Sequence, residues 1–246
     1  MIPYVRQKKI VEELGKKEIV FLEDLVGLFS EVSESTIRRD LKMLEEEGQI
    51  QTLRGGGVKL KSSSYDIPVV EKKEMYKEEK ERIARFAASL VKDNEVVYID
   101  SGTTCLQMIK YLKDKTITVI TSNIQVIYEL DSPTINCIVL GGEVNKTLDS
   151  ISGPLTELTL KNLYFDKAFL GTSGFSVENG INTPDFREAN KKAIVKEKSK
   201  ECYVLADNSK SDKNTLCKAF ELDECIIITD KSSMLLENHA KYFIAD

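Results

Sequence analysis

A turn with one glycine and three hydroxyl side chains follows an apolar run in the middle of the chain. Asp100-Ser101-Gly102-Thr103-Thr104 comes directly after Val96–Ile99 and precedes a helical pattern. Glycine permits a tight turn, and hydroxyls together with backbone N–H groups at the start of a helix can hold an anion such as phosphate. Strand-to-helix turns also use these residues as ordinary caps, so the motif alone does not decide between the two interpretations.

Three later apolar runs end in similar turns. Each is followed by small polar residues or glycines, namely Thr121-Ser122-Asn123, Gly141-Gly142 and Gly171-Thr172-Ser173-Gly174. If these runs are parallel strands, their carboxyl ends meet at one edge of the sheet, where open α/β sheets bind ligands. The repetition of such turns predicts a ligand crevice more strongly than any one of them does.

Two charged pairs could close this crevice. Glu188 and Lys192 lie one helical turn apart and share a helix face. Asp207 follows the apolar run Tyr203–Ala206, and Lys210 comes three residues later. By itself, Glu188 with Lys192 is most simply a surface ion pair. Asp207, at the end of a predicted strand, points more directly to a ligand site.

A capped amphipathic helix is predicted over residues 34–47. Ser33 can accept a hydrogen bond as the N-cap, and Gly48 suits the position after the last turn. Ile37, Leu41 and Leu44 form one apolar face. The cap and the hydroxyl and basic side chains of the other face could contact base edges and phosphates of DNA: Ser33, Ser35, Thr36, Arg38, Arg39 and Lys42. The alternative is an ordinary solvated helix face.

A glycine-rich turn follows this helix. Gln49–Leu53 and Val58–Leu60 flank Arg54-Gly55-Gly56-Gly57, a pattern that predicts a β-hairpin. Arg54 at its tip could contact the minor groove or a phosphate. A solvated helix face would need no such hairpin, so the hairpin favours DNA binding.

The elements that must position these motifs form two domains. Helical patterns over Pro3–Leu14 and Leu22–Leu28, with the capped helix and the hairpin, predict a winged helix-turn-helix domain over 1–60. Residues 61–75 are polar and are predicted to be a linker. Over 76–246, short apolar runs alternate with helical patterns, which predicts an α/β domain with a mainly parallel sheet. Its helices are expected at 79–91, 103–112, 123–130 and 185–199.

Composition excludes several classes of protein. The 246 residues carry a net charge of −5, and neither predicted domain is basic, so DNA contact would need a local basic patch. Five cysteines without a Cys-x-x-Cys pair argue against a disulfide framework and a zinc site, and those in strands, Cys137, Cys202 and Cys225, are expected in the core. The single histidine, His239, is expected at the surface. We therefore expect no metal and no cofactor. Without an export signal or a membrane-length apolar segment, a cytoplasmic protein with no membrane partner is expected.

At the quoted motifs the chain resembles the DeoR family of bacterial transcriptional regulators. The N-terminal resemblance lies in Val32-Ser33-x-x-Thr36-Ile37-Arg38-Arg39-Asp40-Leu41, then Leu44, Gly48 and Arg54-Gly55-Gly56. The family often has a histidine before the Gly-Gly turn, and this chain has Arg54 there. The C-terminal resemblance lies in Ile99 to Thr104, Thr121-Ser122-Asn123, Leu140-Gly141-Gly142, Phe165 to Gly171, Glu188-Ala189 with Lys192, and Ala206-Asp207-x-x-Lys210. It covers nearly the whole chain in the same order.

The resemblance implies a repressor of a sugar-catabolism operon. Its partners would be operator double-stranded DNA, a phosphorylated sugar as effector and further copies of the chain, in a dimer or tetramer. The family's sensor domain is related to sugar-phosphate isomerases and coenzyme A transferases. The resemblance implies that the effector is bound by Asp100, Ser101, Gly102, Thr103, Thr104, Thr121, Asn123, Gly141, Gly142, Gly171, Thr172, Glu188, Lys192, Asp207 and Lys210.

The alternative is an active sugar-phosphate isomerase with an appended regulatory domain. Glu188 or Asp100 would then be the general base, and Lys210 or Lys192 would stabilise an enediolate. The predicted winged helix favours the regulator, because an isomerase needs no recognition helix. The preferred interpretation is therefore a protein without enzymatic activity.

Overall fold

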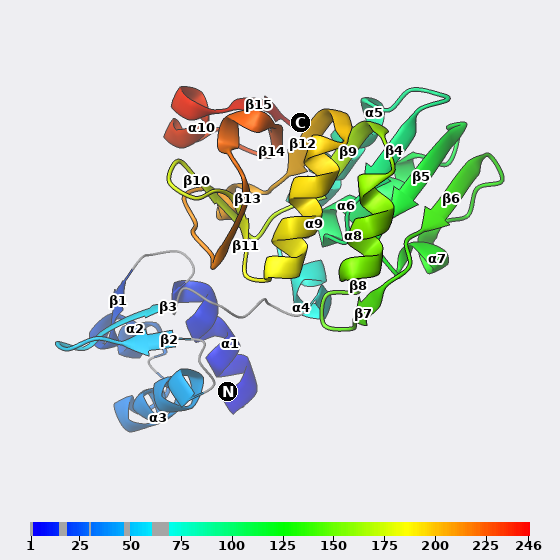
Figure 1. Ribbon diagram of the computed structural model, residues 1–246. Coiled ribbons are helices and arrows are strands. Elements are labelled where there is room, and N and C mark those ends of the chain that lie inside the picture. The colour runs from blue at the N-terminus through cyan, green and yellow to red at the C-terminus, as the bar shows by residue number, and fades with distance from the viewer. Residues whose placement is uncertain (1, 15–18, 30, 47–49, 61–68) are drawn as a thin grey trace. The chain divides into compact units, whose positions relative to one another are not determined.

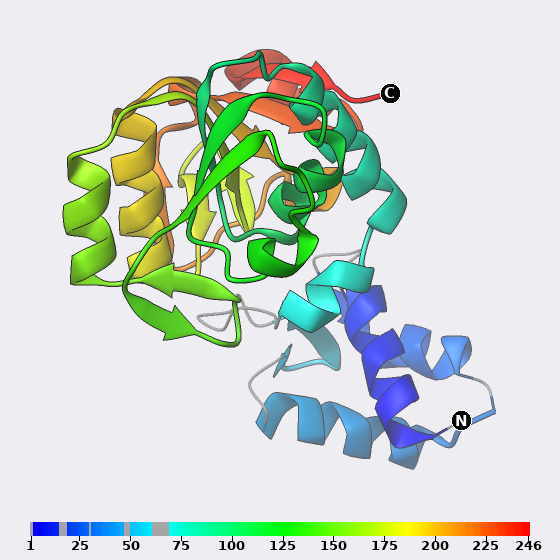
Figure 2. The same cartoon turned by 90° about the vertical axis from the view of Figure 1, so that its right-hand side faces the viewer.

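The computed structural model describes residues 2–14, 19–29, 31–46, 50–60 and 69–246. The chain divides into two compact units, 1–63 and 64–246, which are drawn in Figures 1 and 2. The predicted residues Gly48 and Gln49 and the first part of the predicted linker, 61–68, lie outside the described residues.

The N-terminal unit is a winged helix-turn-helix, as predicted. Its helices and strands are α1 (Pro3–Leu14), β1 (Val20–Phe21), α2 (Leu22–Leu28), α3 (Glu34–Glu46), β2 (Ile50–Thr52) and β3 (Gly57–Leu60). The strands form an antiparallel sheet in the order β1-β3-β2. Apolar side chains of all three helices, such as Ile10, Leu25 and Ile37, pack with Ile50 and Val58 in one core. Strand β1 was not predicted, because two residues are too few to show a period.

A buried ion pair joins α1 to α3. The Arg6 guanidinium pairs with Asp40 through Nε, and its Nη2 lies 3.2 Å from Asp40 Oδ1. Both side chains are buried, and Gln7 also donates to Asp40. The acidic residue of the Arg-Arg-Asp-Leu motif therefore faces the interior of the unit, while the two arginines before it are exposed.

The C-terminal unit is built on a seven-stranded sheet in which every neighbouring pair is parallel. The strand order is β15-β14-β12-β9-β4-β5-β6. This confirms the predicted α/β fold class, and the sheet is parallel throughout. In chain order the strands are β4 (Val96–Ile99), β5 (Ile117–Thr121), β6 (Ile135–Val139), β9 (Phe165–Gly171), β12 (Ser199–Leu205), β14 (Ile226–Thr229) and β15 (Lys241–Ile244).

Helices cover both faces of this sheet (Figure 1). One core contains side chains of α5 (Lys77–Ser89), α6 (Thr103–Gln107), η1 (Met108–Tyr111) and α7 (Val126–Glu129). The other contains side chains of α8 (Pro154–Lys161), α9 (Phe186–Glu197) and α10 (Met234–His239). Cys202 and Cys225 are buried in the second core and Cys137 packs against the first, all as free thiols, as predicted. His239 is exposed, as predicted.

Several short elements at the carboxyl edge of the sheet were not predicted from the sequence. Strands β10 (Gly174–Ser176), β11 (Gly180–Thr183) and β13 (Cys217–Phe220) form a small antiparallel sheet, and β7 (Glu143–Asn145) pairs with β8 (Ser150–Ser152). Two 3₁₀ turns, η2 (Asn208–Lys210) and η3 (Leu222–Glu224), complete the unit. Segments of three or four residues are too short to display a hydrophobic period.

Three predicted segments differ from the structure. The linker prediction for 61–75 is wrong in its second part, where Val69–Glu74 forms helix α4. Val69 is buried and its N–H donates to the Thr147 carbonyl, contacts that a local polar composition does not reveal. The helix predicted at 103–112 changes to a 3₁₀ helix at Met108. The helix predicted at 123–130 is confined to α7, because Asn123 forms a β-bridge with Ser150.

No helix among the described residues is long and apolar enough to cross a membrane. The described part of the chain also contains no group of three or more His, Cys, Asp or Glu side chains that could hold a metal ion.

Candidate functional site

A pocket lies at the carboxyl ends of β4, β9 and β12. Nine of the predicted effector residues line it: Ser101, Gly102, Thr103, Thr104, Gly171, Thr172, Glu188, Lys192 and Lys210. Seven lining residues were not among the predicted effector residues, although Ser173 belongs to one of the predicted turns: Val69, Lys72, Lys80, Leu148, Ser173, Thr183 and Leu205. Val69 and Lys72 lie on α4, in the segment predicted to be a linker. Leu148 and Thr183 lie on or beside short strands that a hydrophobic period does not reveal.

Two glycines let the turns after β4 and β9 approach closely. A Cβ atom on Gly102 would lie 3.3 Å from the Cα of Gly171, and the reverse contact is equally short. The Asp100 carboxylate links the same turns, because Oδ2 accepts the Gly171 N–H at 3.0 Å. A side chain at Gly102 or Gly171 would crowd the neighbouring turn. Both glycines therefore serve the packing between the two strands and also line the pocket.

Four buried charges form a cluster at the base of the pocket, and two of them, Glu188 and Lys192, belong to its lining. Lys192 forms an ion pair with Asp100, and its Nζ lies 3.9 Å from Glu188 Oε2. Lys191 Nζ lies 2.9 Å from Glu188 Oε1 and donates to the Ser150 hydroxyl at 2.7 Å. The four side chains have no net charge. Glu188 and Lys192 are therefore not the surface ion pair that their spacing suggested, because both side chains are buried.

Electrostatics keep the Asp100–Lys192 pair ionised. Burial alone would raise the pKa of Asp100, but the charges of Lys192 and Lys191 lower it overall. Burial alone would lower the pKa of Lys192, but Asp100 and Glu188 raise it overall. A carboxylate with a lowered pKa is a weak proton acceptor, so Asp100 is poorly suited to serve as a general base.

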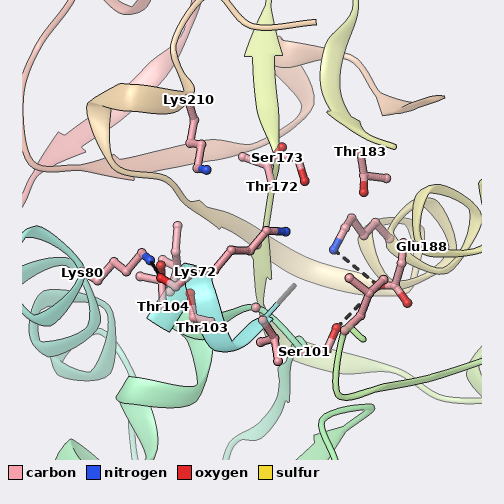
Figure 3. Close-up of a pocket in the computed structure, with 16 residues that line it drawn as sticks. Lys72, Lys80, Ser101, Thr103, Thr104, Thr172, Ser173, Thr183, Glu188 and Lys210 are labelled. Carbon is pink, nitrogen blue, oxygen red and sulfur yellow. Dashed lines mark hydrogen bonds and ion pairs between the residues drawn. The ribbon is translucent and has the colours of Figure 1, made fainter. Parts of the chain in front are cut away.

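Lysine side chains from three separate elements line one side of the pocket (Figure 3). Lys72 comes from α4, Lys80 from α5 and Lys210 from η2. Lys80 is buried, and burial lowers its pKa to about 8. Its ammonium donates to the Lys72 carbonyl oxygen. These cations supply the positive charge that the neutral cluster beneath them does not.

Hydroxyl groups and one carboxylate lie across the pocket from these lysines. Figure 3 shows Thr183 and Glu188 on that side, with Ser173 and Thr172 between. Glu188 also accepts a hydrogen bond from Ser101 at 3.5 Å. The pocket therefore combines a cationic side with a side of hydrogen-bonding groups.

Two predicted effector residues, Thr121 at the end of β5 and Asn123 after it, make structural contacts and do not line the pocket. The Thr121 hydroxyl donates to the Ile99 carbonyl at 2.6 Å and accepts the Asn123 N–H. Asn123 Oδ1 accepts the Gln125 N–H at 2.8 Å, at the start of the α7 segment. The sheet order explains this difference, because β5 lies beyond β4 from the strands β9 and β12 that border the pocket.

Gly141, Gly142 and Asp207 are also outside the pocket lining, and Asp100 lies beneath it. The Gly141 carbonyl accepts a hydrogen bond from Thr156. Gly142 has a φ of +151°, and a Cβ there would lie 2.1 Å from the Thr156 hydroxyl oxygen. Asp207 is buried and accepts the Ser209 N–H as the cap of η2. Each is explained by local structure, which sequence spacing could not separate from ligand contact.

The predicted DNA-binding residues lie on α3 and the wing. Ser33 accepts the Thr36 N–H at 3.4 Å, the expected capping contact. Arg38 pairs with Glu34 at 2.7 Å, with both side chains more than half exposed, and Lys42 lies 3.8 Å from Glu46. The remaining residues of the predicted set are exposed or half-buried: Ser35, Thr36, Arg39 and Arg54.

The wing turn brings Arg54 to an exposed position. Gly55 and Gly56, which follow it, have φ values of +94° and +81°. These left-handed conformations favour glycine, so the Gly-Gly sequence is what permits this tight turn. The turn connects β2 to β3 and carries Arg54 beyond the paired strands.

Comparisons with known proteins match both units. Residues 6–63 match the DeoR-like helix-turn-helix domain, and residues 75–231 match the DeoR C terminal sensor domain. The uncharacterized HTH-type transcriptional regulator FruR of Bacillus subtilis is 35% identical over 241 residues, which is 97% of this chain and 96% of that protein. The transcriptional repressor AccR of Agrobacterium fabrum is 31% identical over 232 residues, 93% of this chain and 90% of that protein.

A solved structure of ribose 5-phosphate isomerase A from Methanocaldococcus jannaschii also matches. The identity is 20% and the TM-score is 0.41, over 56% of this chain and 55% of that chain. A likeness of this degree carries no argument about function.

Proposed function

Because this chain belongs to the DeoR family of DNA-binding transcriptional regulators, we propose that it represses a sugar-catabolism operon until a phosphorylated sugar binds in its C-terminal pocket. The observation that carries the effector's chemistry is the placement of Lys72, Lys80 and Lys210 on one side of the pocket, beside Thr103 and Thr104 and opposite Thr183 and Glu188. A phosphate dianion is bound well by several cations, and a sugar by hydroxyl and carboxylate groups that exchange hydrogen bonds with it.

On the cationic side, Lys80 and Lys210 would contact the phosphate, with Thr103 and Thr104 supplying hydroxyl donors. On the other side, Glu188 and Thr183 would hydrogen-bond sugar hydroxyls. The neutral cluster below holds these groups in position and adds no net charge, so the selectivity for an anion rests on the lysine side.

The DNA-binding part of the proposal rests on α3 and the wing. A homo-oligomer would present two copies of α3 to half-sites about one helical turn of DNA, roughly 34 Å, or a multiple of it apart. Arg38, Arg39 and Lys42 would contact phosphates or base edges, and Arg54 would reach the backbone or minor groove beside them. Effector binding would then favour an arrangement with lower operator affinity, by population shift.

The isomerase alternative gains no support from the pocket. Asp100 is engaged by Lys192 and by the Gly171 N–H, and it lies beneath the lining. Glu188 lines the pocket, but its Oε1 already accepts from Ser150 and Lys191, and its Oε2 accepts from Ser101. Incubation with ribose 5-phosphate, followed by an assay for ketose, tests this alternative directly.

The effector proposal is tested by the thermal midpoint of the full chain against a panel of sugar phosphates and the matching unphosphorylated sugars. A ligand that binds only the folded state must raise the midpoint. We expect one phosphorylated sugar to raise it and its unphosphorylated counterpart to have no effect. The same compound should release the protein from DNA sites selected from a random pool. Equal responses to phosphorylated and unphosphorylated sugars would contradict the phosphate assignment.

A further inference from the structure

Helix α4 contributes to the pocket although it lies at the very start of the described C-terminal unit. Val69 and Lys72 of this helix are both lining residues. In the sequence, α4 follows directly after residues 61–68, through which the chain passes from the DNA-binding unit. Its polar sequence is the reason that it was predicted to be part of a linker.

We propose that Lys72 is part of the effector's anion site, and that an anion bound between Lys72, Lys80 and Lys210 fixes α4 against the sensor domain. This inference rests on the proposed function and names the element through which that function is regulated. The effector would thereby set the position of the chain segment that leads to the DNA-binding unit.

Contacts at Val69 and Lys72 help to hold α4 against the rest of the C-terminal unit. At its start, the Val69 N–H donates to the Thr147 carbonyl at 3.0 Å, and the Val69 side chain is buried. Further along, the Lys72 carbonyl accepts from the Lys80 ammonium. The side chain of Val70, which follows Val69 in the helix, is 74% exposed. A helix of six residues has no stability of its own in water, so its position depends on these contacts.

The anion would add to this anchoring through side chains rather than through new backbone contacts. Figure 3 shows the Lys210 and Lys72 side chains extending into the pocket from η2 and α4, and the Lys80 side chain reaching from α5 to the Lys72 main chain. An ammonium group has three donors, so Lys80 can hold the Lys72 carbonyl and an anion together. The pKa of Lys80 is lowered mainly by burial, and the nearby charges of Lys210 and Lys72 lower it further, while Asp207 and Glu79 oppose the shift. A bound anion would favour the protonated form of Lys80 and so strengthen this arrangement.

The neighbouring residue provides a matched control. Lys73 lies on the same helix and carries the same charge, but it does not line this pocket. The Lys72 contact to Lys80 uses the main-chain carbonyl, which a side-chain substitution leaves in place. Lys72→Gln therefore removes the ammonium and keeps the main-chain contact to Lys80, and Lys73→Gln removes an equal charge from the same helix.

The experiment titrates inorganic phosphate into the full chain at constant ionic strength. Two quantities are measured: the apparent affinity from the thermal midpoint, and hydrogen exchange of the peptide covering residues 69–76. Phosphate should stabilise the wild type saturably and slow exchange in this peptide. Lys72→Gln should weaken the affinity about tenfold and abolish the slowing, Lys73→Gln should behave as the wild type, and Lys72→Arg should restore most of the response.

Each contrary outcome overturns a different claim. A wild type that shows no saturable response to phosphate overturns the anion site, and with it the proposed effector class. A wild-type response that Lys72→Gln leaves unchanged overturns only the role of Lys72. If Lys72→Gln binds phosphate more weakly but phosphate does not slow the exchange of residues 69–76 in the wild type, Lys72 contacts the anion and the claim that the anion fixes α4 is wrong.

Discussion

Asp100 and Lys192 form a buried ion pair that ties the turn after β4 to helix α9. The exposed fractions of the two side chains are 0% and 7%. Asp100 also accepts the N–H of Gly171, so one carboxylate connects three segments of the sensor domain. A sequence pattern that suggested ligand contact thus marks a structural link directly under the pocket.

Asp100→Asn should destabilise the protein strongly, because it leaves Lys192 buried with less charge compensation. Breaking one partner of a buried pair costs about 3–5 kcal/mol, which urea unfolding would measure. Lys200→Gln is the control, since Lys200 is 78% exposed in its pair with Asp166 and should matter little. Equal stability of Asp100→Asn and the wild type would refute the structural role.

The same pair predicts a dependence of stability on pH. The folded-state pKa of Asp100 is lowered, so its contribution is complete above the ordinary Asp value of about 4 and is lost as the pH falls further. The wild type should therefore lose its stability advantage over Asp100→Asn in acid. A constant difference between the two proteins down to the acid transition would contradict this.

Arg38→Ala and Arg39→Ala should each weaken binding to DNA selected from a random pool while leaving the thermal response to sugar phosphates unchanged. Each lost phosphate contact should also reduce the slope of log affinity against log salt by about one. Lys9→Ala, which removes an exposed charge from α1, is the control and should bind as the wild type. Unchanged DNA affinity in both arginine variants would show that α3 is not the recognition helix.

Lys80 predicts a pH dependence of effector binding. Burial lowers its pKa to about 8, with Lys210 and Lys72 acting in the same direction and Asp207 and Glu79 opposing. Because an anion needs the protonated ammonium, the affinity for a sugar phosphate should fall as the pH rises above this value. The second pKa of a phosphate ester is about 6, so the ligand does not change charge in this range. Calorimetric titration of the wild type from pH 7 to 9.5 would measure the fall.

Lys80→Met should bind more weakly at pH 7 and lose this dependence. Lys77→Met, at an exposed position of the same helix, should keep both the affinity and the pH profile. A Lys80→Met variant with the wild-type profile would assign the titration to another group.

Lys210→Met should give a repressor that stays on DNA at effector concentrations that release the wild type. The variant loses one cation of the pocket, while its DNA-binding unit is unaltered. DNA release as a function of sugar phosphate, followed by fluorescence anisotropy, should shift to higher concentration by about tenfold or more. Lys231→Met, at an exposed position outside the pocket, should release as the wild type does.

Gly142→Ala tests whether Gly142, in the turn after β6, is needed for the stability of the fold or for effector binding. A methyl group there would meet the Thr156 hydroxyl oxygen at 2.1 Å in a left-handed backbone conformation, so we expect a loss of about 2 kcal/mol or more in stability. Gly141→Ala is the matched control, since its nearest contact would be an ordinary 3.7 Å. At a temperature where Gly142→Ala is folded, its effector affinity should equal that of the wild type. A loss of effector affinity in folded Gly142→Ala would show that this turn contributes to the ligand site.

The amino-acid sequence by itself determined the elements with a clear period or cap. Ile37, Leu41 and Leu44 mark α3 at helical spacing, and Ser33 begins it with the expected capping contact. The short apolar runs that became β4, β5 and β6 likewise pair in parallel as their pattern predicted. These features are local, because hydrophobic spacing and caps act within a few residues of the chain.

The tertiary structure alone decided which of these residues meet. Strand order places the turns after β4 and β9 side by side at the pocket and leaves Asn123 and Gly142 to pack elsewhere. Lys191 and Lys192 are adjacent and equally able to pair with Glu188 by spacing, yet only Lys192 reaches both Asp100 and the pocket. Lys72 entered the pocket from a segment whose sequence is simply polar. Long-range packing determines such contacts, and no spacing along the chain encodes the order of strands in a sheet.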